Sequence, residues 1–172
     1  PALAAVVVDR LTAEGVEIRE RIKIARIDHT DGRFTATLAD GETITGDQLL
    51  VAAGRAPELA PLDLAAGGVD FDARGVVVDA RLRSRSNRRV YAAGDAAGGY
   101  QFTHVAGYHA GIVIRNTLFR LPAKADHGAV PWVTYTDPEL AQVGLTESAA
   151  RDRHGDGVQV VESAFAENDR AR

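Results

Sequence analysis

Val90-Tyr91-Ala92-Ala93-Gly94-Asp95 is the stretch of sequence that decides the fold of this chain. Its short apolar run is typical of a buried β-strand, and the glycine and the aspartate follow it directly. A glycine at a strand end lets a ligand approach the backbone, and the next carboxylate can accept hydrogen bonds from a polyol. A plain turn has the same sequence pattern, so the residues that follow must distinguish a binding site from a turn.

A helix is predicted shortly after this strand, with Thr103 as its N-cap and an end near Phe119, before Pro122. The N-terminus of a helix presents unpaired backbone N–H groups and the positive end of the helix dipole. Close to Asp95, that end would stabilise negative charge on a bound group. The sequence therefore predicts a binding site whose members are Gly94, Asp95, Gln101, Phe102, Thr103 and His104.

The segments before this site predict mixed helix and strand. Apolar residues at helical spacing favour a helix over residues 1–14, with Gly15 suited to a C-terminal cap. From Val16 onward, alternating apolar residues and the Asp31-Gly32 and Asp40-Gly41 pairs predict a meander of short antiparallel strands. The unbroken apolar run Leu49–Ala53, which ends at Gly54, favours a strand covered on both faces.

The later segments continue the α/β pattern and become α+β at the end. Residues 56–68 are rich in Pro, Gly and Ala and predict a crossover between domains, followed by short strands at 69–71 and 76–78. Beyond Val130 we expect a strand at 132–135, a helix after the cap Thr146, and a strand at 158–165. Trp132 and Tyr135 are expected in a core or an interface.

Composition excludes several classes of function. The chain has 172 residues, 45% of them hydrophobic, and its 24 acidic and 20 basic residues give a net charge of -4, which argues against nucleic-acid binding. The absence of Cys excludes disulfides, thiolate metal sites and cysteine nucleophiles within these residues. The apolar runs are far shorter than the roughly 20 residues of a membrane helix. Because the sequence contains no Met, we expect a fragment of a longer protein.

Two further groups of residues favour a structural interpretation over a functional one. The arginine-rich stretch 81–89 lacks interleaved aromatic residues and predicts a solvated loop. His104 and His109 are five residues apart, so they do not share a helical face well, and a metal site is disfavoured. His29, His127 and His154 lie beside turn-type sequence and are expected to be exposed.

Three segments of the chain carry a family resemblance: Leu50–Pro57, then Val90–Asp95 with Gln101–His104, then Thr136–Glu147. Together they resemble the flavin-dependent pyridine nucleotide-disulfide oxidoreductases, most closely the mercuric reductase and dihydrolipoamide dehydrogenase branch. The segments occur in the order found in that family and cover nearly the whole chain.

This resemblance implies parts of two Rossmann-like domains and the start of a third domain. Residues 1–52 are similar to the C-terminal part of the NAD(P)-binding domain, and residues 53–127 to the C-terminal part of the FAD-binding domain. Residues 128–172 resemble the N-terminal part of an α+β dimerisation domain, which implies a cytoplasmic homodimer.

The resemblance also implies roles for individual residues. Asp95 would hold the ribityl chain of FAD, with Gly94 permitting its close approach. The stretch Gln101–His104 would lie against the pyrimidine side of the flavin ring, where the helix N-terminus favours negative charge. Gly54 would lie near the nicotinamide nucleotide, and Ile24 near its adenosine.

Three parts of the family's catalytic machinery are expected outside residues 1–172. These are the Gly-x-Gly-x-x-Gly fingerprint, the redox Cys pair and the His-Glu proton relay, so no catalytic residue is assigned within this chain. The resemblance implies hydride transfer between NAD(P)H and a disulfide or a thiol-bound metal ion, through FAD. Two alternatives remain: a non-catalytic cofactor-binding or dimerisation module, and a Cys-less FAD-dependent relative that reduces quinone or oxygen.

Overall fold

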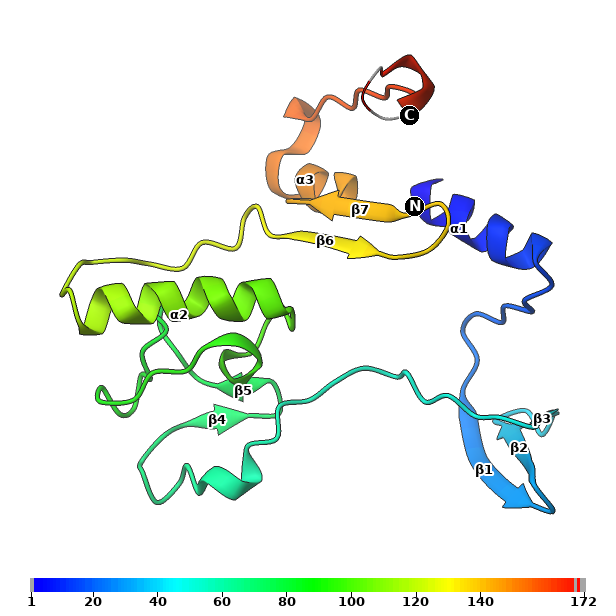
Figure 1. Cartoon of the computed structure of the whole chain (residues 1–172), viewed down its shortest axis with the longest axis horizontal. Helices are drawn as coiled ribbons and strands as arrows, with labels where there is room; N and C mark the ends of the chain where they lie inside the picture. The colour runs from blue at the N-terminus through cyan, green and yellow to red at the C-terminus, as the bar shows by residue number, and fades with distance from the viewer. Residues whose placement is uncertain (1, 169, 171–172) are drawn as a thin grey trace.

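The computed structural model describes residues 2–168 and 170, which form three parts around an open space (Figure 1). One part is an antiparallel sheet near the N-terminus. The second contains helix α2 (Thr103–Thr117) and the hairpin of β4 (Phe71–Asp72) and β5 (Gly75–Val76). The third gathers helix α1 (Ala2–Ala13) with the C-terminal elements. The mixed helix and strand content agrees with the predicted α/β class.

Helix α1 confirms the helix predicted for residues 1–14 and the role of Gly15 at its end. Gly15 has φ +91°, a conformation that glycine adopts without steric cost. Its N–H donates to the carbonyl of Thr12 at 3.0 Å, and the N–H of Val16 donates to the carbonyl of Leu11 at 3.0 Å. This pair of bonds is a Schellman motif, which satisfies carbonyls that the helix end would leave unpaired.

The predicted meander is confirmed as a sheet of three antiparallel strands, although it begins at Ile24 and not at Val16. Its strands are β1 (Ile24–Thr30), β2 (Arg33–Leu38) and β3 (Thr43–Gly46). Asp31 and Gly32 connect β1 to β2 with φ values of +52° and +76°, as a two-residue hairpin of type I′ requires.

The strand predicted at Leu49–Ala53 is wrong for the described structure. Residues 47–59 have no helix or strand and cross as an extended segment to the part that contains β4 and β5 (Figure 1). Leu50 is 89% exposed and Val51 is 72% exposed. A strand needs a hydrogen-bonded neighbour, and no described strand is paired with this segment.

A small core holds the second part together. Val69, Val76 and Ala92 are buried against one another, with Leu64 and Val90 packed around them. The strands predicted here are displaced or shortened. Strand β4 begins at Phe71, β5 covers Gly75–Val76, and the strand predicted at 90–93 is reduced to a single bridge between Tyr91 and Arg83. A two-stranded hairpin provides too little pairing to extend these strands further.

Helix α2 confirms the helix predicted after residue 102, with a correction at its start. Phe102, not Thr103, is the N-cap: its backbone is extended, with φ −122° and ψ +142°, and no side chain caps the helix. Thr103 is the first helical residue, so its hydroxyl does not cap the first turn. Among the described residues, no helix is both long and apolar enough to cross a membrane.

The third part consists of β6 (Pro131–Thr134), β7 (Leu140–Val143) and α3 (Glu147–His154), with α1 packed beside β7. The Thr146 cap is confirmed, since its hydroxyl accepts a hydrogen bond from the N–H of Ala149 at 3.2 Å. Strand β7 was not predicted. The strand predicted at 158–165 is wrong: these residues lack a partner strand among those described and expose their apolar side chains, with Phe165 79% exposed.

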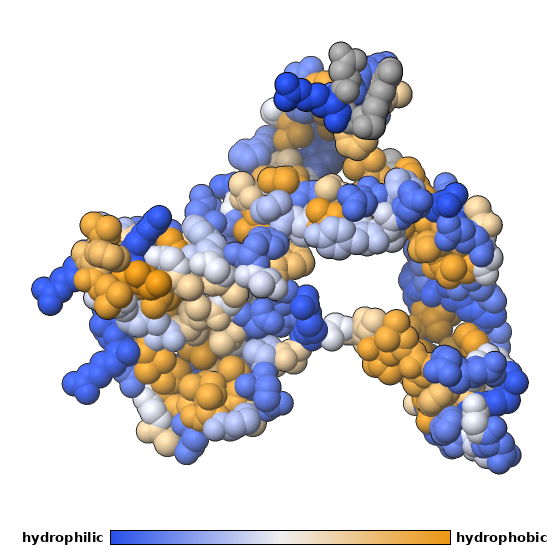
Figure 2. Space-filling model, viewed as in Figure 1, coloured by the Kyte–Doolittle hydropathy of each residue, from blue (hydrophilic) through white to orange (hydrophobic). Residues whose placement is uncertain are grey.

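The chain exposes far more surface than a compact domain of its size. Its accessible surface is 13456 Å², against the roughly 8,100 Å² expected for a compact monomer of this mass. Apolar side chains form surface patches on each of the three parts (Figure 2). Burial of apolar surface is the main favourable term in folding, so these patches are surfaces suited to contact with another apolar surface.

Candidate functional site

Gly94 lies where a short 3₁₀ turn, η2 (Gly94–Ala97), packs against helix α2. Its φ is +59°, in the left-handed region. A Cβ added to Gly94 would lie 2.7 Å from the Cβ of Ala106 on α2. Glycine is thus required here both by the backbone conformation and by the close approach of the helix.

Asp95 follows at the exposed face of the same turn. Its backbone carbonyl accepts a hydrogen bond from the N–H of Gly98 at 3.0 Å, which closes η2. Its carboxylate makes neither a hydrogen bond nor an ion pair to any residue that the structure describes. The carboxylate therefore keeps its full capacity to accept hydrogen bonds from a ligand.

Gly75 in hairpin β4–β5 supports η2 from the other side and was not singled out from sequence. A Cβ on Gly75 would lie 2.6 Å from the N atom of Gly98 and 2.8 Å from the carbonyl oxygen of Ala96. The hairpin backbone thus contacts the backbone of η2 directly. The positive φ that this position needs, +151°, could not be inferred without knowing that the two segments meet.

The structure brings four of the predicted residues together at the start of α2. Gln101 and Phe102 are half-buried, and Thr103 and His104 are exposed. The rings of Phe102 and His104 stack with centroids 5.3 Å apart, and Phe102 also stacks on Trp132 at 6.4 Å. Trp132 lies in β6, so the start of α2 contacts the third part of the chain. Trp132 is half-buried at this contact, as predicted, whereas the same prediction is wrong for Tyr135, which is 84% exposed.

A hydrogen bond from Arg55, the residue after Gly54, connects this segment to the cluster at residues 101–104. Arg55 donates from Nη2 to the carbonyl oxygen of Gln101 at 2.7 Å. Gly54 itself has φ +113°, and a Cβ added to it would meet nothing within 4 Å, so its surroundings are open. Ile24 is not brought to this cluster, because it begins β1 in the first part and is 54% exposed.

His109 is the residue that the sequence reasoning missed. It is 1% exposed and accepts a hydrogen bond at Nδ1 from the N–H of Gly94 at 3.0 Å. Its Nε2 lies 2.7 Å from Nε2 of His127. Burial in the first place, and the charge of His127 in the second, lower the pKa of His109 below its ordinary value.

A sequence signal for His109 existed. It lies four residues after Val105 and three before Ile112, on the buried face of α2. A histidine on the apolar face of a helix has to find partners for its ring nitrogens. His127 is exposed, as predicted, but its ring still reaches His109 because residues 123–127 run back along α2.

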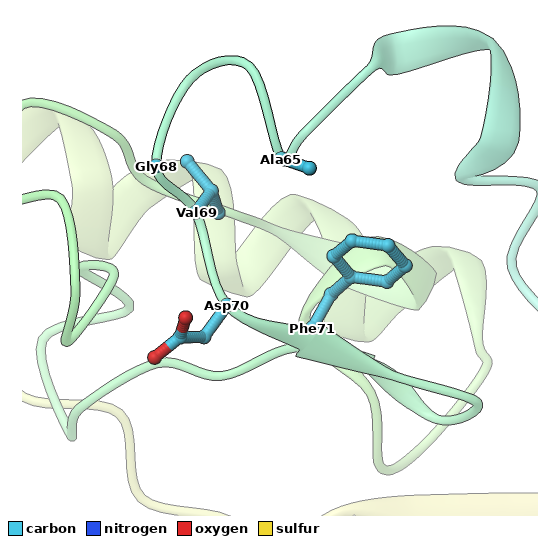
Figure 3. Close-up of a pocket in the computed structure, with 5 residues that line it drawn as sticks. All are labelled: Ala65, Gly68, Val69, Asp70 and Phe71. Carbon is cyan, nitrogen blue, oxygen red and sulfur yellow. The ribbon is translucent and has the colours of Figure 1, made fainter.

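A surface hollow of about 440 Å³ lies away from these residues (Figure 3). Its lining comes from the crossover and the start of β4: Ala65, Gly68, Val69, Asp70 and Phe71. It contains one carboxylate and no basic side chain. None of the predicted site residues lines it, so the hollow is separate from the candidate site.

Most of the chain matches two models of one protein family. The family model described as pyridine nucleotide-disulphide oxidoreductase matches residues 1–110, and the model for the dimerisation domain of the same family matches residues 130–172. The chain belongs to the pyridine nucleotide-disulphide oxidoreductase family. Enzymes of this family are FAD-dependent and use NAD(P)H.

Individual relatives of this oxidoreductase chain agree with the family assignment. A mercuric reductase of Staphylococcus aureus is 35% identical over 89% of this chain and 28% of its own length. A dihydrolipoyl dehydrogenase of Bacillus subtilis is 36% identical over 95% of this chain and 35% of its own length. The family resemblance seen in the sequence is thus confirmed.

A solved structure of the same family has a similar fold. The HOCl-induced flavoprotein disulfide reductase RclA from Escherichia coli superimposes with a TM-score of 0.82 at 29% identity, over 99% of this chain and 39% of that one. The oxidoreductase chain therefore spans about a third of the length of the relatives it matches.

Proposed function

We propose that the full-length gene product is an FAD-dependent oxidoreductase that transfers hydride between NAD(P)H and a disulfide or a thiol-bound metal ion. The flavin would pass electrons to a cysteine pair outside this chain, because these 172 residues contain no Cys. Relatives named mercuric reductase and dihydrolipoyl dehydrogenase support both substrate classes.

The observation that carries this proposal is the Asp95 carboxylate. It is exposed, has no partner among the described residues, and follows Gly94, whose missing side chain makes room for Ala106 of α2 and not for a ligand. The hydroxyl groups of a polyol chain such as the ribityl group need an exposed hydrogen-bond acceptor of this kind. These residues fit FAD.

The start of α2 supports the second part of the flavin site. No side chain caps this helix, so its first-turn N–H groups and its positive dipole end are available to a ligand. Residues 101–104 would lie against the pyrimidine side of the flavin ring and stabilise negative charge there. When bound, FAD itself would supply the hydride chemistry.

The nucleotide partner would bind nearer the first part of the chain. Gly54 has open surroundings, and Arg55 joins it to Gln101, which supports a nicotinamide position close to the flavin. Ile24 would contact the adenosine from β1. The match of residues 130–172 to a dimerisation domain supports a homodimer, which we place in the cytoplasm.

The direct test is the flavin content of the full-length gene product after purification, read from its absorbance between about 350 and 500 nm. Removing a hydrogen bond to a charged group costs about 1.5–3 kcal/mol, so Asp95→Ala should weaken FAD binding about 10- to 100-fold. Asp152→Ala is the matched control, because Asp152 is an exposed carboxylate on α3. Equal FAD affinity in both variants would contradict the assignment of Asp95.

A second experiment separates the substrate classes from the Cys-less alternative. NADPH and NADH oxidation by the full-length product is measured with a disulfide, with mercuric ion in excess thiol, and with a quinone. Disulfide or mercuric ion turnover supports the proposal. Turnover of quinone alone, in a protein without a Cys pair, would favour the relative that reduces quinone or oxygen.

A further inference from the structure

The backbone of Gly94 is held by a buried imidazole. The Gly94 N–H donates to Nδ1 of His109 at 3.0 Å, and the His109 side chain is 1% exposed. An N–H group can only donate, so Nδ1 of His109 must be the acceptor and cannot carry a proton. The ring proton of neutral His109 therefore lies on Nε2.

The tautomer of His109 in turn determines that Nε2 of His127 is a hydrogen-bond acceptor. The two Nε2 atoms are 2.7 Å apart, a hydrogen-bond distance, and His109 provides the proton between them. Nε2 of His127 must then be an acceptor without a proton. The hydrogen bonds run in one direction, from Gly94 to His109 and from His109 to His127.

We propose that His109 is a positioning residue of the flavin site, which fixes the backbone at Gly94 and so presents the Asp95 carboxylate to the ribityl chain, with His127 fixing the tautomer of His109. This inference rests on the proposed FAD-binding function. Its geometric support is that Gly94 has a left-handed φ of +59° at the start of η2, a conformation secured by the bond to His109.

The arrangement makes the site sensitive to acid. Protonation of His109 at Nδ1 would place an N–H against the N–H of Gly94 and break their hydrogen bond. Other polar groups also surround this pair. The rings of Tyr100 and Tyr108 pack on the ring of His127, with centroids 6.3 and 6.4 Å away. A carboxylate is adjacent in sequence to each end of the hydrogen-bonded series, because Asp126 precedes His127 and Asp95 follows Gly94. Tyr108 also accepts a hydrogen bond at its hydroxyl from the N–H of Asp126 at 2.8 Å.

A matched pair of substitutions tests the role of the acceptor at residue 109. The oxygen of Asn can replace Nδ1, whereas Leu has nearly the same shape as Asn and no acceptor. In the full-length product we expect His109→Leu to raise the FAD dissociation constant about tenfold or more, and His109→Asn to restore it to within about threefold of wild type. Equal losses in both variants would overturn the inference, since they would show a role in packing alone.

A second pair tests His127, whose exposed ring can be changed without disturbing the core. His127→Gln keeps an acceptor near the position of Nε2, whereas His127→Leu removes the acceptor. Because burial lowers the pKa of His109, we expect wild type to lose FAD in acid only below the ordinary range of histidine. His127→Gln should bind FAD nearly as well as wild type, whereas His127→Leu should bind FAD more weakly, and equal affinity in the two variants would contradict the role of His127 as an acceptor. If His109→Leu fails to fold, this pair decides the question by itself.

The outcomes separate this inference from the proposed function. A wild-type product that holds no FAD would overturn the proposed function and this inference together. A wild type that holds FAD, with unchanged affinity in both His109→Leu and His127→Leu, would overturn the positioning role alone. Circular dichroism and size-exclusion chromatography of each variant establish that it is folded.

Discussion

Arg55 and Gln101 are 46 positions apart in the sequence, yet Nη2 of Arg55 lies 2.7 Å from the carbonyl oxygen of Gln101. This bond joins the extended segment that contains Gly54 to the residue two positions before helix α2. It therefore connects the residue proposed to lie near nicotinamide with the stretch proposed to lie against the flavin. A single guanidinium thus links the two proposed cofactor positions.

Replacing Arg55 should loosen the start of α2. A typical hydrogen bond contributes about 0.5–1.5 kcal/mol, so we expect Arg55→Met to weaken FAD binding of the full-length product by about two- to tenfold. Arg153→Met, on the exposed surface of α3, is the control. FAD titration followed by fluorescence measures both. Equal affinity in the two variants would show that the bond to Gln101 does not support the flavin site.

Gly94→Ala should destabilise the folded protein for two separable reasons. A left-handed conformation costs a non-glycine residue about 1–2 kcal/mol, and the clash with Ala106 adds about 1–3 kcal/mol. Gly68→Ala is the matched control, because Gly68 has a similar φ of +61° and open space around its Cβ position. Urea unfolding of both variants gives the cost of the clash as their difference.

The clash at Gly94 can also be tested by a compensating change. Ala106→Gly removes the Cβ that the new methyl group would meet at 2.7 Å. In the double variant the destabilisation should be smaller than the sum of the two single changes, because the residues are in contact. Strict additivity would show that α2 moves away from η2 at little cost.

Folding stability should decrease in mild acid because of His109. The pKa of its buried ring is lowered from the ordinary 6.5, chiefly by burial. An unfolded chain takes up this proton near pH 6.5, whereas the folded chain takes it up only at lower pH. The stabilisation is therefore complete above about pH 6.5 and is lost as the pH falls below it. Urea unfolding between about pH 5 and 8 measures this slope, which His109→Asn should reduce.

The apolar segment around Val51 should be covered in the full-length product. Val51 is 72% exposed in the described structure, although its run of apolar residues is typical of a strand covered on both faces. Val51→Asp should therefore abolish soluble full-length protein, while Val51→Ile should be tolerated, because burial of an unpaired carboxylate is costly. Normal expression of Val51→Asp would show that this segment stays exposed.

Local signals predicted the elements that depend on neighbouring residues. Gly15 ends α1, Asp31-Gly32 makes the first hairpin, and Thr146 caps α3, because each acts through bonds within a few residues of itself. The strands predicted at 49–53 and 158–165 failed for the opposite reason. Apolar sequence favours a strand, but a strand forms only where a partner lies alongside.

The candidate site also has features that depend on local sequence and features that depend on tertiary contacts. The sequence by itself determined the family, the order Gly94-Asp95, and the helix that begins eight residues after Asp95, since these depend on residue type and short spacing. Only the tertiary structure decided that His109 accepts from Gly94, that His127 completes this pair, and that Arg55 reaches Gln101. Each of these contacts joins residues 15 or more positions apart, and such contacts form only when packing folds the chain back on itself.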